Sequence, residues 1–333
     1  LPPLVRNTAA RDSGLGTSLF KRLCEAHPLA VVHLGFQYRM NADIQKLANR
    51  LVYDGHLRCG SLQVASRKIQ YPVDPAKALE SWPFEQQKPN AQFAMPWVSD
   101  ALDPMRGAVF VNTDPIPGLE SRVEGSDLVQ NNSEINIIRI LVNTLHACGI
   151  EGRQIGVLSP YRAQLKQIEI EFGIRMADED ERQQLLRQSS GNAAESSSAR
   201  IPGLDVHTID RYQGRDADVI VISWVRSNHA QVIGELLRDW HRINVAITRA
   251  KRKLIMVGSK NTLLKSPLFA EMLRMLVEAD AVVDVPTEQI FTEAQCLLDA
   301  RARGKAKKAA ARTAGSALLK GHPILKDIIA EQG

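Results

Sequence analysis

The sequence predicts an α/β fold in which a parallel β-sheet has helices on both faces. Short apolar runs alternate with amphipathic stretches of helical period between residues 31 and 280, which is typical of strands that are each followed by a covering helix. The run DVIVISWV at residues 218–225 is apolar on both of its faces, as expected for a central strand of such a sheet. Of the 333 residues, 44% are hydrophobic, which is enough for a large core.

The first predicted strand is the run AVVHL at residues 30–34, which we expect to be short and buried. A helix follows over residues 41–52. Asn41 is a suitable N-cap for this helix, and Gly55 lies just past its end. The next apolar run, AVFV at residues 108–111, is expected to return to the sheet.

The second half of the sheet follows the same alternation. A helix is expected to begin at Asn132 or Ser133 and to end before Gly149, because its inward positions are apolar at helical spacing. The remaining expected elements are a strand at 155–158, a helix from Tyr161 onward, the central strand at 218–225, a helix at 239–251, a strand at 253–257 and a helix at 261–278.

The net charge of +5 is concentrated at the C-terminal end. Residues 301–333 hold eight Lys or Arg and two Asp or Glu, so the rest of the chain has one excess negative charge, and the basic average is weak evidence for a nucleic-acid partner. The stretch 176–200 is polar and Ser-rich, which predicts a disordered surface insertion. Residues 301–312 hold six basic residues and no acid, a pattern that fits a nuclear-import signal, a DNA-binding arm or a solvated linker.

Several classes of protein are excluded. No stretch of about 18 apolar residues is present, so we expect no membrane partner. The four cysteines form no C-x-x-C pair, which predicts reduced thiols and no metal or cluster site in this chain. The N-terminal stretch has no apolar core region of a signal peptide. The sequence begins with Leu1 rather than Met, so we expect it to be part of a longer protein.

No complete motif for hydrolysis is present. The sequence contains no G-x-x-x-x-G-K-[ST], no H-E-x-x-H and no G-x-S-x-G. It does contain four short polar signatures, each at a predicted strand end or helix start. Because open parallel sheets bind ligands at the carboxyl ends of their strands, we expect these signatures to gather there.

Two of the signatures lie between a strand and the helix that follows it. In FQYRM (36–40), Tyr38 can stack on a base and Arg39 can bind a phosphate through two hydrogen bonds. In SPYRAQ (159–164), Ser159 can cap a helix whose first N–H groups suit a phosphate. A surface arginine beside a half-buried tyrosine, and an ordinary N-cap, are the alternative interpretations.

The other two signatures come later in the chain. The segment VHTIDRYQGRDADVIVIS (206–223) crowds Thr208, Asp210, Gln213, Gly214, Arg215 and Asp216 into one loop between apolar runs. Packing alone explains such a dense polar loop poorly. The segment NVAITRAK (244–251) places Arg249 near the end of a helix with one apolar face. The alternative for Arg249 is a solvated charge at a helix end.

Taken in order, these signatures resemble the C-terminal half of superfamily-one helicases that move 5′ to 3′. FQYRM is similar to their motif IV, the QGRD loop to motif V, NVAITRAK to motif VI, and LPPLV at the N-terminus to the end of motif III. Longer stretches such as ADIQKLANRLVYDGHLRCGS and GELLRDWHRINVAITRAKRKLIMVGS most resemble the eukaryotic replication helicase–nucleases that process Okazaki-fragment flaps.

The resemblance implies a second RecA-like domain, which is a P-loop NTPase fold without its own P-loop. Residues 1–30 would then be the end of motif III and a linker, residues 31–280 the domain, and residues 281–333 a C-terminal extension. ATP would bind between this domain and a first RecA-like domain that supplies the P-loop and the Mg²⁺ ligands. An iron–sulfur cluster in the parent is left open, and this chain alone is expected to be inactive.

The resemblance also implies roles for particular residues. Arg39 and Arg249 would be catalytic arginines that reach the γ-phosphate. Tyr38 would stack on the adenine, and Gln213, Gly214 and Asp216 would complete the ATP side. The residues expected to line the path of single-stranded DNA are Ser159, Tyr161, His207, Thr208 and Arg211.

Two alternatives to a DNA helicase half remain at this stage. One is an RNA helicase half of the nonsense-mediated-decay type, whose members usually have Glu where this chain has Asp216. The other is a non-catalytic module that binds nucleic acid or protein without a P-loop partner. For the helicase, the expected partners are single-stranded DNA and the first RecA-like domain, with replication and single-strand-binding proteins left open. The expected location is the nucleus, with a mitochondrial pool left open.

Overall fold

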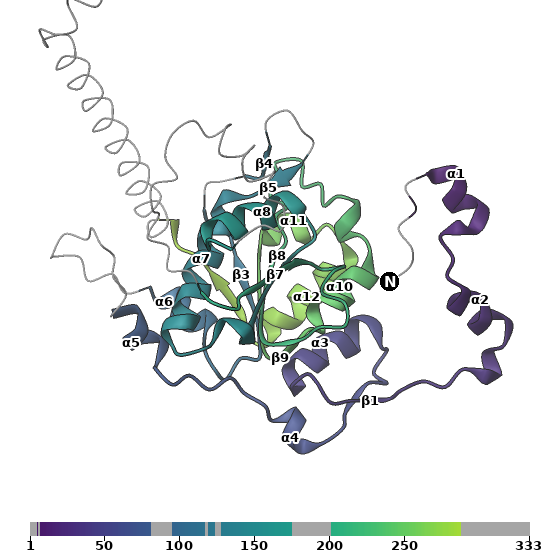
Figure 1. Ribbon diagram of the computed structural model, residues 1–333, viewed down its shortest axis with the longest axis horizontal. Helices are drawn as coiled ribbons and strands as arrows, with labels where there is room; N and C mark the ends of the chain where they lie inside the picture. Colours follow the sequence, from purple (N-terminus) through teal and green to yellow (C-terminus); the bar gives the residue numbers. More distant parts are fainter. Residues whose placement is uncertain are drawn as a thin grey trace, which may run out of the picture. The chain divides into compact units, whose positions relative to one another are not determined.

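A six-stranded parallel sheet forms the centre of the computed structural model (Figure 1). The structure describes residues 5, 7–80, 95–116, 119–123, 128–174 and 201–287. The sheet has the order β10-β3-β9-β8-β6-β7. Its strands are β3 (Ala108–Asn112), β6 (Ile155–Ser159), β7 (Asp205–Thr208), β8 (Ala217–Ser223), β9 (Ala250–Gly258) and β10 (Val282–Asp284). The predicted fold class is confirmed. The predicted insertion 176–200 and basic tail 301–312 lie outside the described residues.

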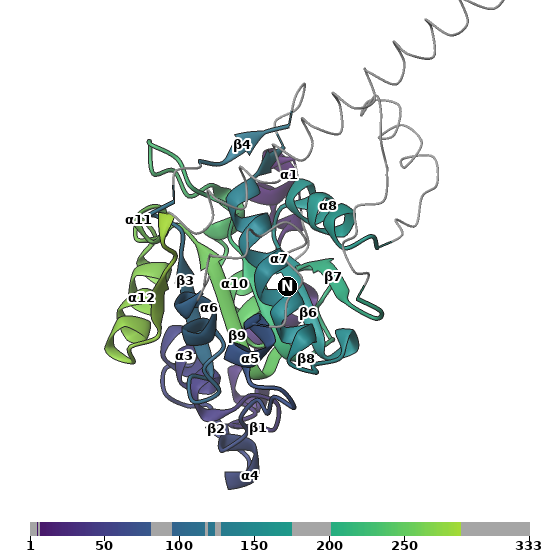
Figure 2. The same ribbon diagram turned by 90° about the vertical axis from the view of Figure 1, so that its left-hand side faces the viewer.

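Helices lie on both faces of the sheet (Figure 2). The α-helices are α1 (Thr8–Ala10), α2 (Leu19–Ala26), α3 (Ala42–Val52), α4 (Leu62–Ala65), α5 (Pro75–Glu80), α6 (Pro96–Ala101), α7 (Asn132–Ala147), α8 (Arg162–Glu171), α10 (Trp240–Ile247), α11 (Lys260–Leu263) and α12 (Pro267–Glu278). Short turns of other helix types are η1 (Arg11–Leu15), η2 (Pro28–Ala30), η3 (Gly152–Gln154) and η4 (Glu235–Leu237). Two-residue strands pair as β1 (Phe36–Gln37) with β2 (Arg58–Cys59), and as β4 (Ser121–Arg122) with β5 (Val129–Gln130).

The two faces of the central strands bury different helices. On one face, Ile220 and Ile222 of β8 share a core with α3, α10 and α12. Val219 and Val221, which alternate with these isoleucines, point to the opposite face because side chains alternate along a strand, and α7 packs against β8 and β9 there. Residues 219–223 of β8 are therefore buried on both faces of the sheet, as the continuous apolar sequence predicts.

Helix caps appear where the sequence signals them. The Asn41 side chain accepts a hydrogen bond from the Ile44 N–H at 3.1 Å, and Gly55 adopts φ +83° after the end of α3. The cap of α7 is Asn131, one residue before the predicted start, and its side chain accepts from the Glu134 N–H at 3.2 Å.

Three predicted boundaries are wrong. The helix expected at 239–251 ends at Ile247, and β9 begins at Ala250 rather than 253. The hydroxyl of Thr248 donates to the Asn244 carbonyl at 2.7 Å, which satisfies a helix-end acceptor and lets the chain turn into the sheet. The helix expected at 261–278 is α11 and α12, because Pro267 lacks the N–H that a continuous helix needs. The strand expected at 218–225 ends at Ser223.

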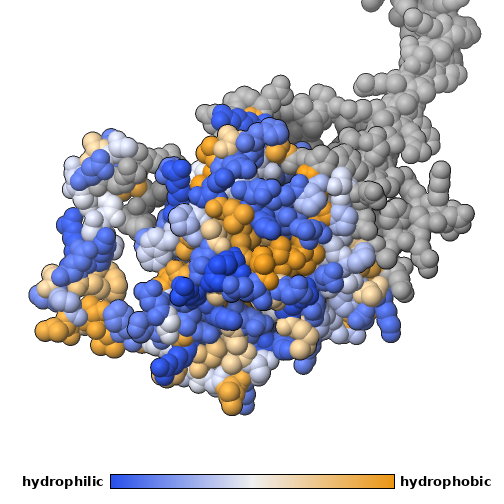
Figure 3. All heavy atoms as spheres, turned by 180° about the vertical axis from the view of Figure 1, so that it is seen from behind, coloured by the Kyte–Doolittle hydropathy of each residue, from blue (hydrophilic) through white to orange (hydrophobic). Residues whose placement is uncertain are grey.

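The buried strand predicted at residues 30–34 is also wrong. Residues 31–35 form no strand, and Val32 and Leu34 are 84% and 88% exposed. No residue of α1, α2 or η2 is buried either, and apolar side chains show at the surface of this segment on the left of Figure 3. An apolar run becomes a buried strand only where a sheet edge lies beside it, which local sequence does not record. At the other end, β10 begins two residues beyond the predicted boundary at 280 and pairs with β3 in the sheet.

The connection between β7 and β8 crosses a strand without a helix. In the sheet, β6 lies between β7 and β8, so residues 209–216 must pass over it. Tyr212 is buried in this connection, and a Cβ at Gly156 of β6 would lie 2.6 Å from the Tyr212 hydroxyl. Gly156 therefore provides the space in which the tyrosine packs. We call residues 209–216 the crossing loop.

Candidate functional site

Four charged residues meet where β8 and β9 begin. Asp216 immediately precedes β8, Arg249 immediately precedes β9, and Lys251 is the second residue of β9. Arg39, which follows β1, reaches the same place and donates from Nη1 to the Thr248 carbonyl at 3.1 Å. We call Arg39, Asp216, Arg249 and Lys251 the arginine cluster. The expectation that all four signatures lie at the carboxyl ends of the strands is therefore wrong for this group, because these residues lead into β8 and β9.

Asp216 is the carboxylate of the cluster. Its Oδ2 accepts from Arg39 Nε at 3.1 Å, and its Oδ1 lies 2.6 Å from Lys251 Nζ. Partial burial alone raises the pKa of Asp216, but the hydrogen bonds and charges of Lys251 and Arg39 outweigh it and lower the pKa. Asp216 is therefore ionised and holds both cations in place.

Arg249 donates to neutral oxygens. Its Nε donates to the Val245 carbonyl at 2.9 Å, and its Nη2 donates to the Thr248 hydroxyl at 2.8 Å. Burial, followed by the nearby charge of Arg39, lowers the pKa of Arg249 to about 10. The guanidinium stays charged at neutral pH, and its charge is desolvated beside another cation. Within this cluster of described residues, three cations face one carboxylate, so an anion is the missing counter-charge.

Tyr38 adjoins this cluster in the chain and offers an open aromatic face. Its side chain is 65% exposed, and a Cβ at Gly60 would lie 2.3 Å from the ring, so the ring rests directly on the Gly60 backbone. Arg67 Nη1 donates to the carbonyls of Tyr38 and Arg39 at 3.1 and 3.3 Å. Sequence reasoning missed Gly60, Arg67 and Lys251. Only Lys251 had a signal, since it ends the NVAITRAK segment.

The residues predicted to meet DNA lie at the opposite ends of the strands. Ser159 and Thr208 are register partners at the last residues of β6 and β7. Ser159 is fully buried and its hydroxyl accepts from the Tyr161 N–H at 3.3 Å, so in this structure it shapes the turn before α8. The Thr208 hydroxyl accepts from the N–H of Arg211, which is exposed. The structure therefore brings Ser159, Tyr161, Thr208 and Arg211 to the carboxyl edge.

His207 points elsewhere. Its Nε2 lies 2.9 Å from Asp205 Oδ1 and 3.1 Å from Arg215 Nη1, so it belongs to a charged group on the edge strand β7. The crossing loop joins the two edges, because it runs from the carboxyl end of β7 to the amino end of β8. Gln213 and Gly214 are exposed in it, and Gly214 has φ +90°, a conformation that favours glycine.

A buried polar network that the sequence analysis missed supports the carboxyl edge. Glu134 of α7 is fully buried, and its Oε2 accepts from the Ser223 hydroxyl at 2.6 Å and the Val225 N–H at 2.9 Å. Gln164 of α8 donates to the same Ser223 hydroxyl at 3.0 Å. Burial raises the pKa of Glu134 to about 8, although the hydrogen bonds from Ser223 and Val225 oppose it. Val225, in the turn that Glu134 holds, has φ +70°, a strained value for a β-branched residue.

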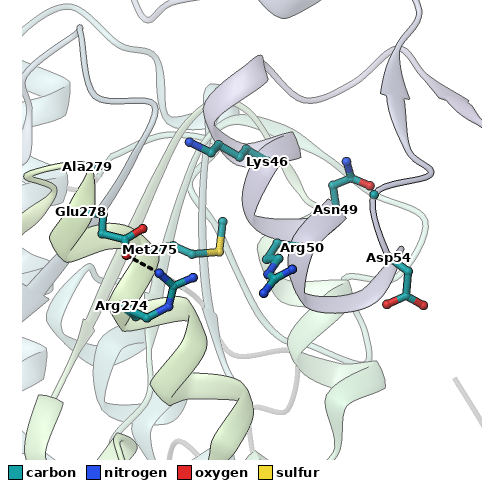
Figure 4. Close-up of a pocket in the computed structure, with 9 residues that line it drawn as sticks. Lys46, Asn49, Arg50, Asp54, Arg274, Met275, Glu278 and Ala279 are labelled. Atoms are coloured by element: carbon teal, nitrogen blue, oxygen red, sulfur yellow. Dashed lines mark hydrogen bonds and ion pairs between the residues drawn. The ribbon is translucent and has the colours of Figure 1, made fainter.

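A surface hollow with a cavity volume of about 630 Å³ lies between α3 and α12 (Figure 4). Its lining includes Arg50 and Arg274. Both pair with Glu271, at 2.9 Å in each case, and Arg274 also pairs with Glu278 (Figure 4). Their charges are already neutralised, which distinguishes this hollow from the arginine cluster.

The described residues offer little for a metal ion or a bilayer. They contain no group of three or more His, Cys, Asp or Glu side chains that could hold a metal. No helix in this described part is long and apolar enough to span a membrane.

Comparison with known proteins places the chain in a class. A family profile described as an AAA domain matches residues 15–261, which is most of the chain, and the chain belongs to this family. It is 38% identical over 293 residues to the DNA replication ATP-dependent helicase/nuclease of Schizosaccharomyces pombe, covering 88% of this chain and 18% of that protein. It is 39% identical over 287 residues to the DNA replication ATP-dependent helicase/nuclease of Bos taurus, covering 86% of this chain and 24% of that protein.

The same similarity extends to budding yeast. The DNA replication ATP-dependent helicase/nuclease of Saccharomyces cerevisiae is 34% identical over 337 residues, covering 99% of this chain and 20% of that protein. The predicted resemblance to the replication helicase–nucleases is confirmed. The chain spans about a fifth of the length of these relatives.

Proposed function

We propose that this chain supplies half of the ATP site and part of the single-stranded DNA track of a 5′-to-3′ DNA helicase that belongs to a longer helicase–nuclease. The observation that carries the proposal is the arginine cluster. Three cations share one carboxylate there, and Arg249 is desolvated beside Arg39 without an acidic partner among its hydrogen bonds. A triphosphate is an anion that fits such a cluster, since guanidinium groups bind phosphate oxygens through paired hydrogen bonds.

The residues have separate tasks in this proposal. Arg39 and Arg249 bind the γ-phosphate, and their charge stabilises the transition state of phosphoryl transfer as negative charge spreads over the phosphate oxygens. The open face of Tyr38 stacks on the adenine. The sequence has no P-loop motif. We therefore assign the P-loop, the Mg²⁺ ligands and the water-activating residue to the first RecA-like domain.

Movement along DNA follows from a site divided between two domains. When ATP binds, the arginine cluster draws the second domain towards the first, and loss of the γ-phosphate removes that attraction. The crossing loop begins beside Thr208 at one edge and ends at Asp216 at the other, so a change at the phosphates reaches the carboxyl edge through one covalent segment. Alternating grip by the two domains then produces translocation.

The test is Arg249→Ala in the protein that also contains the P-loop domain. We expect ATP turnover to fall about 10³-fold or more, because an arginine of this kind acts in the transition state, while single-stranded DNA affinity changes only a few-fold. The matched control is Arg274→Ala, which removes an arginine paired with Glu271 and Glu278 and should leave turnover unchanged. A normal turnover rate in Arg249→Ala would falsify the assignment.

Measurement of ATP turnover also distinguishes the DNA helicase half from the two alternatives. Stimulation of turnover by RNA and not by DNA would indicate the RNA helicase half. The names of the relatives favour DNA. A protein of 333 residues with no partner that carries a P-loop would indicate the non-catalytic module. We expect the isolated chain to hydrolyse no ATP, since its sequence has no Walker A motif, and to regain turnover when the P-loop domain is added.

We also propose a nuclear location, with a mitochondrial pool left open. The basic stretch 301–312 is the segment that fits an import signal. Fusion of these residues to a fluorescent protein measures this directly, and a fusion that stays in the cytoplasm contradicts it. Replication proteins and single-strand-binding proteins are candidate partners. We assign any iron–sulfur cluster to another part of the longer protein.

A further inference from the structure

Trp240, the first residue of α10, differs from the other described tryptophans in its exposure. Its side chain is 47% exposed, whereas Trp97 and Trp224 are 2% and 0% exposed. One exposed apolar side chain needs no explanation by itself. The surroundings of Trp240 give it a more specific meaning.

The indole ring is held in a fixed orientation. It stacks on the imidazole of His241, with ring centroids 3.7 Å apart and an interplanar angle of 24°. Asp239 fixes this imidazole, because its Oδ1 lies 2.9 Å from His241 Nδ1 and also accepts from the His241 N–H at 3.0 Å. The aromatic pair is therefore ordered before any ligand arrives.

A chain of ion pairs connects this aromatic pair to the crossing loop. Arg242 Nη1 lies 3.0 Å from Asp239 Oδ2, and Arg242 Nε lies 3.0 Å from Asp210 Oδ1. The Arg242 side chain is only 12% exposed, whereas the Asp239 and Asp210 side chains are 22% and 50% exposed. Asp210 lies between Thr208 and Arg211 in the chain, and the structure thereby ties Trp240 to the segment that carries two of the predicted DNA-binding residues.

We propose that Trp240, backed by His241, is a base-stacking platform for single-stranded DNA. This inference rests on the proposed function and extends its DNA track beyond Tyr161 and Thr208. An aromatic face tied to a segment that carries an exposed arginine, Arg211, suits a single strand, because a base stacks on the ring while a cation further along binds a phosphate. Stacking is tolerant of sequence, since every base has a π-face.

A docking surface for the first RecA-like domain is the competing explanation. The arginine cluster must face that domain, and it lies at the amino ends of β8 and β9. Trp240 is bound through Arg242 to the loop at the carboxyl edge. Its position therefore favours nucleic acid over the protein domain.

The experiment measures binding of an oligo-dT strand to the 333-residue chain. We expect Trp240→Leu to weaken binding about 5- to 100-fold, which is the range for loss of one stacked base. Trp240→Phe should retain most of the affinity, because it keeps an aromatic face. The matched control is Phe20→Leu, which removes another exposed aromatic ring, 76% exposed, from α2, and should leave binding unchanged.

Two further readouts separate stacking from a structural effect. Oligo-dT should quench tryptophan fluorescence in the wild type, and Trp240→Phe should lose most of this quenching while still binding. Trp240→Leu should leave the slope of log affinity against log salt concentration unchanged. Arg211→Ala should reduce that slope by about one, because one fewer counterion is released.

The outcomes distinguish this inference from the proposed function. If the wild type does not bind oligo-dT, the DNA track itself is wrong. If the wild type binds and Arg211→Ala weakens it but Trp240→Leu does not, the stacking platform alone is wrong. Loss of affinity for the first RecA-like domain in Trp240→Leu, with DNA binding intact, would likewise overturn it in favour of a docking surface.

Discussion

The arginine cluster at the amino ends of β8 and β9 differs in its charge balance from the buried arginines at the carboxyl edge. In the arginine cluster, Arg39 and Lys251 pair with Asp216, whereas Arg249 donates to neutral oxygens. At the carboxyl edge, the two largely buried arginines each have carboxylate partners: Glu120 accepts from Arg226 at 2.8 Å, and Arg242 lies between Asp210 and Asp239. An edge with unmatched charge is ready to bind an anion, whereas an edge with matched charges has a fixed shape. The first suits chemistry on a phosphate and the second suits the positioning of a strand.

The largest predicted effect is on the pH dependence of stability, through the buried side chain of Glu134. Burial raises the pKa of Glu134 to about 8 from its usual 4.5, so the folded protein keeps a proton that the unfolded chain releases. Stability is therefore present below about pH 4.5 and falls as the pH rises to about 8. Relative to Glu134→Gln, which cannot ionise, the wild type should lose about 4 kcal/mol of unfolding free energy over this range.

Urea unfolding at pH 5, 6.5 and 8 measures this difference. Glu235→Gln is the control, because Glu235 is 89% exposed and its removal should not change the pH dependence. Parallel stability curves for the wild type and Glu134→Gln would show that the carboxyl ionises without cost in the folded protein, which would contradict its raised pKa.

The next largest effect is on ATP turnover and concerns the arginine cluster. Arg39→Lys keeps the positive charge but loses the planar group that contacts both Asp216 and the Thr248 carbonyl. We expect ATP turnover in the protein with its P-loop domain to fall about 100-fold, the usual loss when one donor to a transition-state oxygen is removed. Arg50→Lys in α3 is the same substitution at a residue paired with Glu271 and should have no effect. Equal turnover in both variants would mean that a positive charge at position 39 supports turnover without the planar guanidinium group.

The smallest predicted effect is on the unfolding free energy and tests how the crossing loop packs on β6. Gly156→Ala places a Cβ 2.6 Å from the Tyr212 hydroxyl and 2.7 Å from Ile220 Cδ1, which should lower the unfolding free energy by about 2 kcal/mol. Adding Tyr212→Phe removes the nearest atom and should restore part of the loss. Gly35→Ala is the control, since its nearest neighbour would be 3.7 Å away. A fully stable Gly156→Ala protein would indicate that the crossing loop is not tightly packed on β6.

Features with strong local signals were predictable from the sequence. Asn41, Gly55 and the apolar run of β8 each act within a few residues of their own position, and each was confirmed. The chain at residues 30–34 has the same apolar character as a strand, but its burial depends on a neighbour that the local pattern does not contain.

Features of the site that depend on distant partners were only partly predictable. The family resemblance singled out Arg39 and Asp216, but their hydrogen bond joins residues 177 positions apart. The Glu134 network had no sequence signal, because a glutamate in the first turn of a helix is ordinary at the surface. The proposed roles stay predictions for all of these residues, namely Arg39, Arg249, Asp216, Tyr38, Gln213, Gly214 and the DNA-side residues.

The crossing loop also has a thermodynamic consequence. In the proposed function, the two ends of this continuous segment lie at the ATP site and at the DNA track, so a conformation that one ligand favours changes the affinity for the other. Linkage then requires reciprocity: if single-stranded DNA raises nucleotide affinity by some factor, nucleotide must raise DNA affinity by the same factor. One binding measurement, made with and without the second ligand, therefore fixes the coupling free energy in both directions.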